Sequence, residues 1–348
     1  MATHPRLVID ETAPVAMPPI VMLERVSKHF VKPLNFVARI ASALGAGWRE
    51  EAVFAVDGVS LSINQGEIVG LVGESGCGKS TLGRVVAGIL PFSGGKMFYQ
   101  GEDVETMLPG QRRVVDLDIQ MIFQDSLASL NRLMRVQDII GEAPLFHNIV
   151  TSDKLDEYID DIMVRVGLHP NHKRCFPHQF SNGQRQRISI ARALAVKPRF
   201  IVCDEAVAAL DVSMRMQILN LLLKLRDDLG LTYLFISQDL SVVEYFSDRV
   251  AIMYRGCLVE IAPTEKLFAA PNHPYTQWLL TEAPPVDSRH AYTAIEGEIA
   301  LPPDPIRGCQ FYPHCPYAMA RCRETPPPLK EIAPSRYSAC YLNDEKTS

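Results

Sequence analysis

Short apolar runs alternate with longer amphipathic segments through the middle of this chain. The runs at 67–72 (EIVGLV), 200–204 (FIVCD) and 232–237 (TYLFIS) are apolar almost throughout, which is typical of strands covered on both faces. Apolar residues recur at helical spacing between them, most clearly over 216–230. This alternation predicts an α/β fold with a mainly parallel sheet.

Flanking segments predict three additions to that sheet. Strand-like runs at 20–30 and 53–63 predict an antiparallel β part, and 132–175 has mostly helical periodicity. Prolines become frequent after residue 262. We therefore expect 263–348 to be a loop-rich extension that does not continue the sheet.

Composition and charge exclude several classes of protein. The 348 residues are 47% hydrophobic and 22% charged, which suffices for about two folded domains. The net charge of −5 gives no electrostatic reason to expect a nucleic-acid partner. No apolar run reaches the roughly 18 residues of a membrane span, and the N-terminus lacks a secretion signal. We expect an intracellular protein with a flexible tail over 1–20 and an insertion over 31–52.

A glycine-rich motif follows the first buried run. Residues 73–81 (GESGCGKST) match G-x-x-x-x-G-K-[ST] between an apolar strand and a helical segment. Glycines let backbone N–H groups surround phosphate oxygens, the lysine adds positive charge, and the serine hydroxyl ligates Mg²⁺. We expect ATP to be bound by Gly73, Glu74, Ser75, Gly76, Cys77, Gly78, Lys79, Ser80 and Thr81.

Two carboxylates stand at the end of the run at 200–204. Asp204 is its last residue and Glu205 follows directly. In combination with a phosphate-binding loop, this pair predicts an aspartate near Mg²⁺ and a glutamate that acts as general base for the attacking water.

Further motifs carry a family resemblance. Residues 180–194 (FSNGQRQRISIARAL) resemble the signature motif and helix of the ATP-binding cassette (ABC) family. Gln124 matches the family's Q-loop glutamine, 209–211 (ALD) match its D-loop, and Gln238 stands where the family carries a switch histidine. The segments QDSLASLN, DEAVAALDVS and HPYTQWLL resemble, more specifically, the ATPase subunits of dipeptide and oligopeptide importers.

The resemblance implies an organisation and a set of partners. The ATPase domain would span 21–262, with a helical and signature subdomain at 132–185 and an importer-type extension over 263–348. The partners would be a second, paralogous ATPase subunit, two membrane-spanning permease subunits and an extracytoplasmic substrate-binding protein. The chain would then lie at the cytoplasmic face of the membrane as a peripheral subunit.

The resemblance also implies roles for individual residues. Two ATPase subunits of this family pack head to tail with ATP between them. The residues implied to contact the partner's ATP are Ser181, Asn182, Gly183, Gln184 and Asp211. The implied Mg²⁺ ligands are Ser80, Gln124 and Asp204, and the implied catalytic residues are Glu205, Gln238 and Gln124. Phe30 is the candidate for stacking on adenine.

Two residues depart from the family pattern. Asn182 replaces a glycine, and asparagine tolerates left-handed backbone and makes a good N-cap. Gln238 replaces the switch histidine, and an amide cannot exchange protons near neutral pH. These departures predict a slower site, and they leave open the alternative of a soluble regulator or an ATP-holding subunit with little turnover.

Four cysteines crowd into the C-terminal extension. Cys309, Cys315, Cys322 and Cys340 have the spacing C-x5-C-x6-C-x17-C, which fits neither a zinc ribbon nor a bacterial ferredoxin. In a reducing compartment such clustering favours a metal over disulfides. The resemblance points to a [4Fe–4S] cluster, with structural zinc and free thiols as the alternatives.

Overall fold

The computed structural model describes residues 18–31, 52–282 and 307–345. Most of the tail expected over 1–20 and nearly all of the insertion expected over 31–52 lie outside these residues. Among the helices that the structure describes, none combines the length and the apolar character needed to cross a bilayer.

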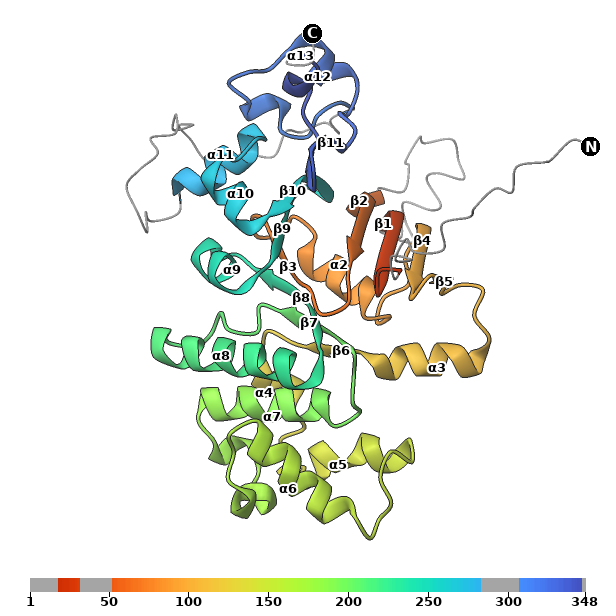
Figure 1. Ribbon diagram of the computed structural model, residues 1–348, viewed down its shortest axis with the longest axis vertical. Coiled ribbons are helices and arrows are strands. Elements are labelled where there is room, and N and C mark those ends of the chain that lie inside the picture. The colour runs from red at the N-terminus through yellow and green to blue at the C-terminus, as the bar shows by residue number, and fades with distance from the viewer. Residues whose placement is uncertain (1–17, 32–51, 283–306, 346–348) are drawn as a thin grey trace, which may run out of the picture.

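The described strands form two sheets (Figure 1). The larger sheet has eight strands in the order β11-β12-β10-β9-β3-β8-β7-β6. Five neighbouring strands of this sheet run parallel, as predicted. They are β3 (Ile68–Val72), β6 (Ile119–Ile122), β7 (Phe200–Asp204), β8 (Thr232–Ser237) and β9 (Arg249–Tyr254). Antiparallel strands extend it: β10 (Cys257–Pro263), β11 (Lys330–Ala333) and β12 (Arg336–Ser338).

The smaller sheet confirms the predicted antiparallel part. Its order is β2-β1-β4-β5. The strands are β1 (Val21–Val31), β2 (Ala52–Ile63), β4 (Gly94–Tyr99) and β5 (Glu102–Asp103). It covers one face of the larger sheet: Val69 and Leu71 of β3 share a core with it, whereas Ile68 and Val72 face the other core. This alternation is the two-residue period of a strand buried on both faces.

Helices cover the rest of the larger sheet and build one end of the molecule. Helix α2 (Lys79–Val86) lies in the core between the two sheets, and α8 (Val212–Leu229) and α9 (Leu240–Phe246) cover the opposite face. The other described α-helices are α3 (Pro109–Asp118), α4 (Ser126–Ser129), α5 (Val136–Phe146), α6 (Leu155–Arg165), α7 (Asn182–Leu194), α10 (Thr264–Ala269), α11 (Pro274–Glu282), α12 (Ala320–Glu324) and α13 (Leu342–Glu345). Short 3-10 helices span Pro170–Arg174, Pro177–Gln179 and Tyr312–His314.

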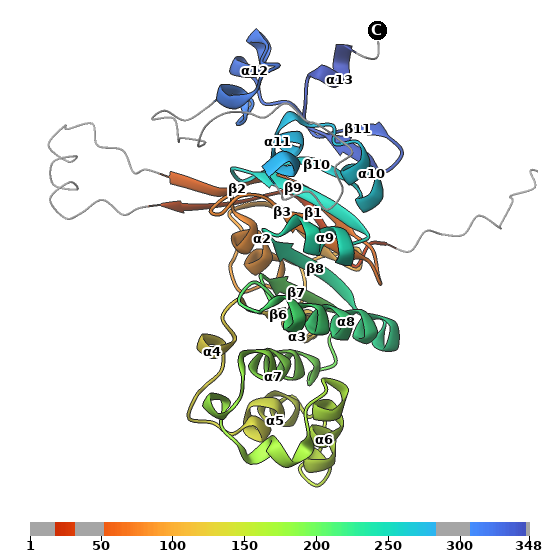
Figure 2. The same ribbon diagram turned by 90° about the vertical axis from the view of Figure 1, so that its left-hand side faces the viewer.

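The predicted helical part is confirmed, and it lies far from the C-terminal extension. Helix α6 buries Ile159, Ile162 and Met163, as its periodicity predicts. Both views place α5 and α6 at one end of the long axis and α12 and α13 at the other, with the larger sheet between them (Figures 1 and 2).

One expectation about the extension is wrong, because it does continue the sheet. Strand β12 pairs antiparallel with β10, with Glu260 opposite Ser338 and Ile261 opposite Tyr337. Pro334 and Ser335 connect β11 to β12, and Ser335 has a φ of +61°. The local proline therefore sits in a turn between two strands, where its fixed φ is compatible with pairing on both sides.

Candidate nucleotide-binding site

The glycine-rich loop joins β3 to α2, as predicted. Gly78 precedes α2 with a φ of +108°, and a Cβ atom there would lie 2.0 Å from the carbonyl oxygen of Ala55 in β2. Only glycine fits both the backbone angle and the space. The N-terminus of α2 therefore opens directly onto the loop, where its free N–H groups and dipole favour a phosphate group.

Lys79 directs its charge into this loop. The side chain is 4% exposed, and its Nζ donates hydrogen bonds to the carbonyl oxygens of Gly73 and Glu74, each at 2.7 Å. A buried ammonium held by backbone carbonyls of its own loop places a positive charge inside the ring of N–H groups.

Ser80 and Asp204 meet although they are far apart in the sequence. Ser80 Oγ donates to Asp204 Oδ1 at 2.7 Å. Asp204 is buried at the end of β7, and this burial raises the pKa of its carboxyl, opposed by the hydrogen bond from Ser80. A hydroxyl and a carboxylate side by side next to a phosphate-binding loop are hard oxygen ligands of the kind that Mg²⁺ uses.

Glu205 lies between two glutamines. Gln124 Nε2 donates to Glu205 Oε2 at 2.5 Å, and Gln238 Nε2 donates to Glu205 Oε1 at 2.6 Å. Glu205 has a φ of +48°, and its N–H donates to the Ile236 carbonyl of β8 at 3.0 Å. Gln124, Glu205 and Gln238 follow β6, β7 and β8, whose carboxyl ends share one edge of the sheet. Such backbone strain is common where a side chain must be aimed at a reacting group.

The signature residues form the start of α7. Ser181 is its N-cap: Ser181 Oγ accepts the Gln184 N–H at 3.3 Å, and Gln184 Oε1 accepts the Ser181 N–H at 3.0 Å. The residues at 181–184 (SNGQ) carry the S-x-x-Q pattern of such a reciprocal capping box. Asn182 is the first helical residue and accepts a hydrogen bond from Arg185. The tolerance of asparagine for left-handed or capping positions is not used here, because Asn182 is helical and Ser181 supplies the cap.

Other predicted residues occupy defined positions around these motifs. A Cβ on Gly183 would lie 2.7 Å from Met214 Sδ, so glycine lets α7 approach α8. Asp211 is the N-cap of α8 and accepts the Met214 N–H at 2.9 Å. Phe30 lies on β1 with 44% of its surface exposed, and it pairs with Val53, two residues before the Ala55 that contacts the loop.

A contact that sequence reasoning missed comes from the C-terminal side. The hydroxyl of Tyr275, in the first turn of α11, accepts the N–H of Glu74 at 3.1 Å. Tyr275 is fully buried. The signal was present in the segment HPYTQWLL, but nothing in the order of the chain indicates that this tyrosine lies against a loop some 200 residues earlier.

The four C-terminal cysteines converge on one cavity. They line it together with His273 and Phe311, and all four are free thiols. Burial raises the pKa of Cys309 and of Cys340 to about 11, and the neighbouring cysteines add to both shifts. Within the described ranges, no group of three or more His, Cys, Asp or Glu side chains is arranged so that it could hold a metal ion.

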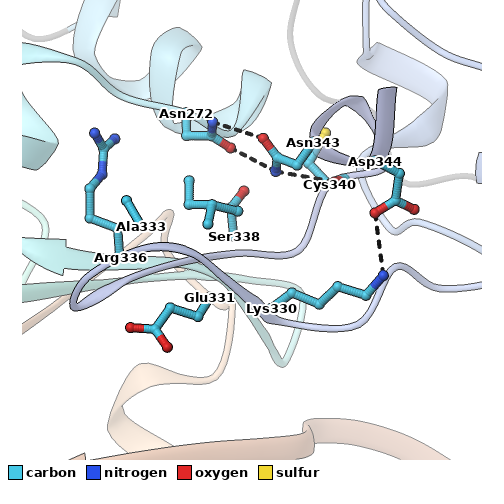
Figure 3. A pocket seen from close by; sticks show the side chains of 10 residues that line it. Asn272, Lys330, Glu331, Ala333, Arg336, Ser338, Cys340, Asn343 and Asp344 are labelled. Atoms are coloured by element: carbon cyan, nitrogen blue, oxygen red, sulfur yellow. Dashed lines mark hydrogen bonds and ion pairs between the residues drawn. The ribbon is translucent and has the colours of Figure 1, made fainter. Parts of the chain in front are cut away.

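A second pocket, of about 600 Å³, adjoins this region (Figure 3). It lies between the 272 segment, the β11–β12 hairpin and α13. Asn272 and Asn343 donate to each other's side-chain oxygen at 3.0 Å, and Lys330 pairs with Asp344 at 3.3 Å across it. These contacts fasten the C-terminal residues onto the segment that leads into α11.

Sequence comparisons match both halves of the chain. A model of the ABC transporter family matches residues 56–208, and a model of the oligopeptide/dipeptide transporter C-terminal region matches 259–322. The oligopeptide transport ATP-binding protein AppF of Bacillus subtilis is 45% identical over 295 residues, which cover 83% of this chain and 90% of AppF. The oligopeptide transport ATP-binding protein OppF of Escherichia coli is 44% identical over 282 residues, which cover 79% of this chain and 84% of OppF.

Solved structures share the fold. The cbiO1 subunit of Clostridium perfringens, part of the ABC transporter complex cbiONQ, has a TM-score of 0.60 at 24% identity and covers 73% of this chain and 92% of its own. The dimeric bacterial ABC transporter cassette MJ0796 has a TM-score of 0.59 at 24% identity, covering 70% and 98%. At this level of identity the likeness concerns the fold alone.

Proposed function

This chain belongs to the ABC transporter family, in the branch with the oligopeptide/dipeptide transporter C-terminal region, and we propose that it hydrolyses ATP to drive the import of peptides. The observation that carries the proposal is the convergence, at one sheet edge, of a lysine-bearing phosphate loop, a Ser80–Asp204 pair and Glu205. The relatives favour this function over that of a soluble regulator.

Each group has a chemical task in that reaction. Lys79 and the N–H groups at the start of α2 bind the β- and γ-phosphates. Ser80, Asp204 and Gln124 would hold Mg²⁺, and the ion would offset negative charge on the phosphates. Glu205 accepts a proton from the attacking water, and the two glutamines fix the orientation of its carboxylate. Phe30 stacks on the adenine ring.

A second ATPase subunit completes the site. Ser181, Asn182 and Asp211 are exposed in this chain, so a facing subunit can reach them. In the head-to-tail arrangement they contact ATP held by that subunit, together with Gly183 and Gln184. We assign the second position to a paralogue, as the family resemblance implies; the departures at Asn182 and Gln238 would then fall in different composite sites.

The permease contact falls in a groove between α5 and α6. This groove of about 360 Å³ is lined by apolar side chains, including those of Met134, Leu155 and Ile159, and by the acidic side chains of Asp138, Glu142 and Asp156. An amphipathic permease helix with basic flanks matches both features. A peptide-binding protein outside the membrane delivers the substrate, and this subunit remains at the cytoplasmic face.

The cysteine-lined cavity holds a [4Fe–4S] cluster in this proposal. Four thiols from separate segments face one space, which is the donor set that such clusters use. A single zinc ion would draw all four sulfurs to about 2.3 Å from one point. Within the described ranges the thiols are not gathered in that way, and the preference for a cluster over zinc rests on the family resemblance. When bound, it would cross-link a segment that has little core of its own.

Substitution of two residues separates binding from hydrolysis. Lys79→Ala removes the cation at the phosphates, and we expect ATP binding to the full chain and transport by the assembled complex to be lost. Glu205→Gln keeps the loop intact, and we expect near-normal ATP affinity with hydrolysis reduced at least 100-fold, on the order of a general base's contribution. Fluorescent-nucleotide titration and phosphate release measure the two quantities. Normal ATP affinity in Lys79→Ala would refute the proposed site.

A further inference from the structure

Tyr275 acts on the same peptide unit that receives Lys79. The peptide bond between Gly73 and Glu74 contributes one carbonyl oxygen and one N–H. The carbonyl oxygen accepts a hydrogen bond from Lys79 Nζ at 2.7 Å, and the N–H donates to Tyr275 Oη at 3.1 Å. Because a peptide unit is planar and its C=O and N–H point in opposite directions, fixing the N–H also fixes the carbonyl that orients the lysine.

The loop has little other freedom at this point. A Cβ atom on Gly73 would lie 2.1 Å from the Met253 carbonyl oxygen and 2.8 Å from Cys77 Sγ. The backbone of Gly73 is therefore packed against β9, and the remaining motion is rotation of the peptide plane that follows it. The hydroxyl of Tyr275 restrains that rotation.

Tyr275 is itself held firmly by the C-terminal half of the chain. Its N–H donates to His273 Nδ1 at 3.1 Å. Burial lowers the pKa of His273 to about 4, so the ring is neutral near pH 7 and this nitrogen can accept. The buried Glu260 accepts the N–H groups of Asn272 and His273 at 2.9 and 2.8 Å.

Aromatic packing completes the anchor. The Tyr254 ring lies 4.4 Å from the Tyr275 ring, and Phe311 lies 5.5 Å from it. Phe311 also lines the cavity shared by the four cysteines. The position of the Tyr275 hydroxyl is thus set by the extension and not by the ATPase domain alone.

We propose that Tyr275 is a positioning residue for ATP: its hydroxyl orients the Gly73–Glu74 peptide unit and, through it, Lys79. The proposal rests on the nucleotide site described above and adds to it a contact supplied by the C-terminal extension. The extension then contributes to nucleotide affinity, and any change in its packing reaches the phosphate loop through one side chain.

A pair of tyrosine substitutions tests this inference. Tyr275→Phe removes only the hydroxyl that accepts the Glu74 N–H. Tyr254→Phe is the matched control, because Tyr254 is buried in the same aromatic group and its hydroxyl has no hydrogen-bond partner among the described residues. In the assembled transporter we expect Tyr275→Phe to raise the KM for ATP about threefold to tenfold, the value of one hydrogen bond, with kcat within about twofold. Tyr254→Phe should leave both constants unchanged.

Hydrogen exchange gives a readout that does not depend on turnover. In the full chain without partners, Tyr275→Phe should speed exchange of the peptide that covers Glu74, while the peptides of β3 and β8 keep their protection. Unchanged KM together with unchanged exchange at Glu74 would overturn the proposal. Fast exchange throughout β3 and β8 would also overturn it, because the hydroxyl would then support the whole fold.

The same experiments distinguish this inference from the proposed function. Lys79→Ala is measured alongside. If Lys79→Ala abolishes ATP binding and Tyr275→Phe has no effect, only the inference about Tyr275 fails. If Lys79→Ala binds ATP normally, the nucleotide site itself is misassigned. The inference about Tyr275 then fails with it, whatever the KM of Tyr275→Phe.

Discussion

Both oxygens of the Glu205 carboxylate accept a hydrogen bond from a glutamine amide. Each bond draws on a lone pair that a general base would offer to water. Gln238 contributes one of the two at 2.6 Å. An amide orients the carboxylate but cannot take up or release a proton, whereas a histidine can do both. The chemistry at this position therefore bears on the rate of hydrolysis more than on ATP affinity.

We predict that Gln238→His raises ATP turnover. General acid–base assistance is worth about 10²–10⁴-fold, and the amide already supplies orientation, so an increase of about tenfold is expected. The affinity for ATP should change little, because the contact is made to Glu205. Phosphate release by the complete transporter, with substrate-loaded binding protein, measures the rate.

The control for this substitution lies outside the site. Gln217 is exposed on α8, and Gln217→His should leave turnover unchanged. If Gln238→His has unchanged or lower turnover, the partner subunit supplies the dominant active site and the prediction is wrong.

At the scale of elements, strand β10 joins the ATPase sheet to the C-terminal extension. Its residue Glu260 is fully buried, and burial raises the pKa of its carboxyl. The carboxylate accepts two backbone N–H groups from the segment before α11, and Arg336 of β12 lies 3.8 Å away. One buried charge thus fastens both α11 and the β11–β12 hairpin to the sheet.

We predict that Glu260→Gln destabilises this junction. The amide has the same shape, but its NH₂ group would face a backbone N–H, and Arg336 would lose its counter-charge. The expected loss is about 1–3 kcal/mol in the free energy of unfolding, the cost of unsatisfied buried polar groups. Denaturant titration of the full chain measures it. Glu331→Gln, on the exposed side of β11, should change stability by no more than about 0.5 kcal/mol; equal losses in the two variants would contradict the prediction.

At the scale of the whole molecule, the C-terminal extension brings together four cysteines from segments that are distant in sequence. The four cysteines face one cavity, and burial raises the pKa values of the Cys309, Cys315 and Cys340 thiols. Uncharged thiols in an apolar cavity add little cohesion, whereas four thiolates on a bound cluster would tie together segments that are distant in sequence.

We predict that the purified chain, handled without oxygen, is brown and contains about four irons. Cys322→Ser should remove the colour and make residues 307–345 sensitive to protease. Cys175→Ser, which lies outside the cavity, should keep both iron and resistance. Iron and sulfide assays with limited proteolysis test the set. Stoichiometric zinc without iron would show that the site binds zinc and not a cluster. A metal-free protein that resists protease would show that the four cysteines are free thiols.

Local sequence was sufficient for the elements and for the chemistry they carry. Continuous apolar runs located β3, β7 and β8, because a strand buried on both faces is apolar almost throughout. Helical periodicity located α6 and α8, because a helix buried on one side repeats its apolar residues at helical spacing. The residues of the phosphate loop were identified because G-x-x-x-x-G-K-[ST] is dictated by local backbone geometry and phosphate charge. Asp204 and Glu205 were identified because they stand at the carboxyl end of a predicted buried strand.

Tertiary structure decided what lies against these motifs. The sequence did not indicate that β12 would pair with β10, because a proline in a two-residue turn has the same composition as a proline in a loop. It also could not place the Tyr275 hydroxyl on the Glu74 N–H. Local periodicity reflects which side of an element is buried, but a contact across some 200 residues depends on how the sheet and the extension pack in three dimensions.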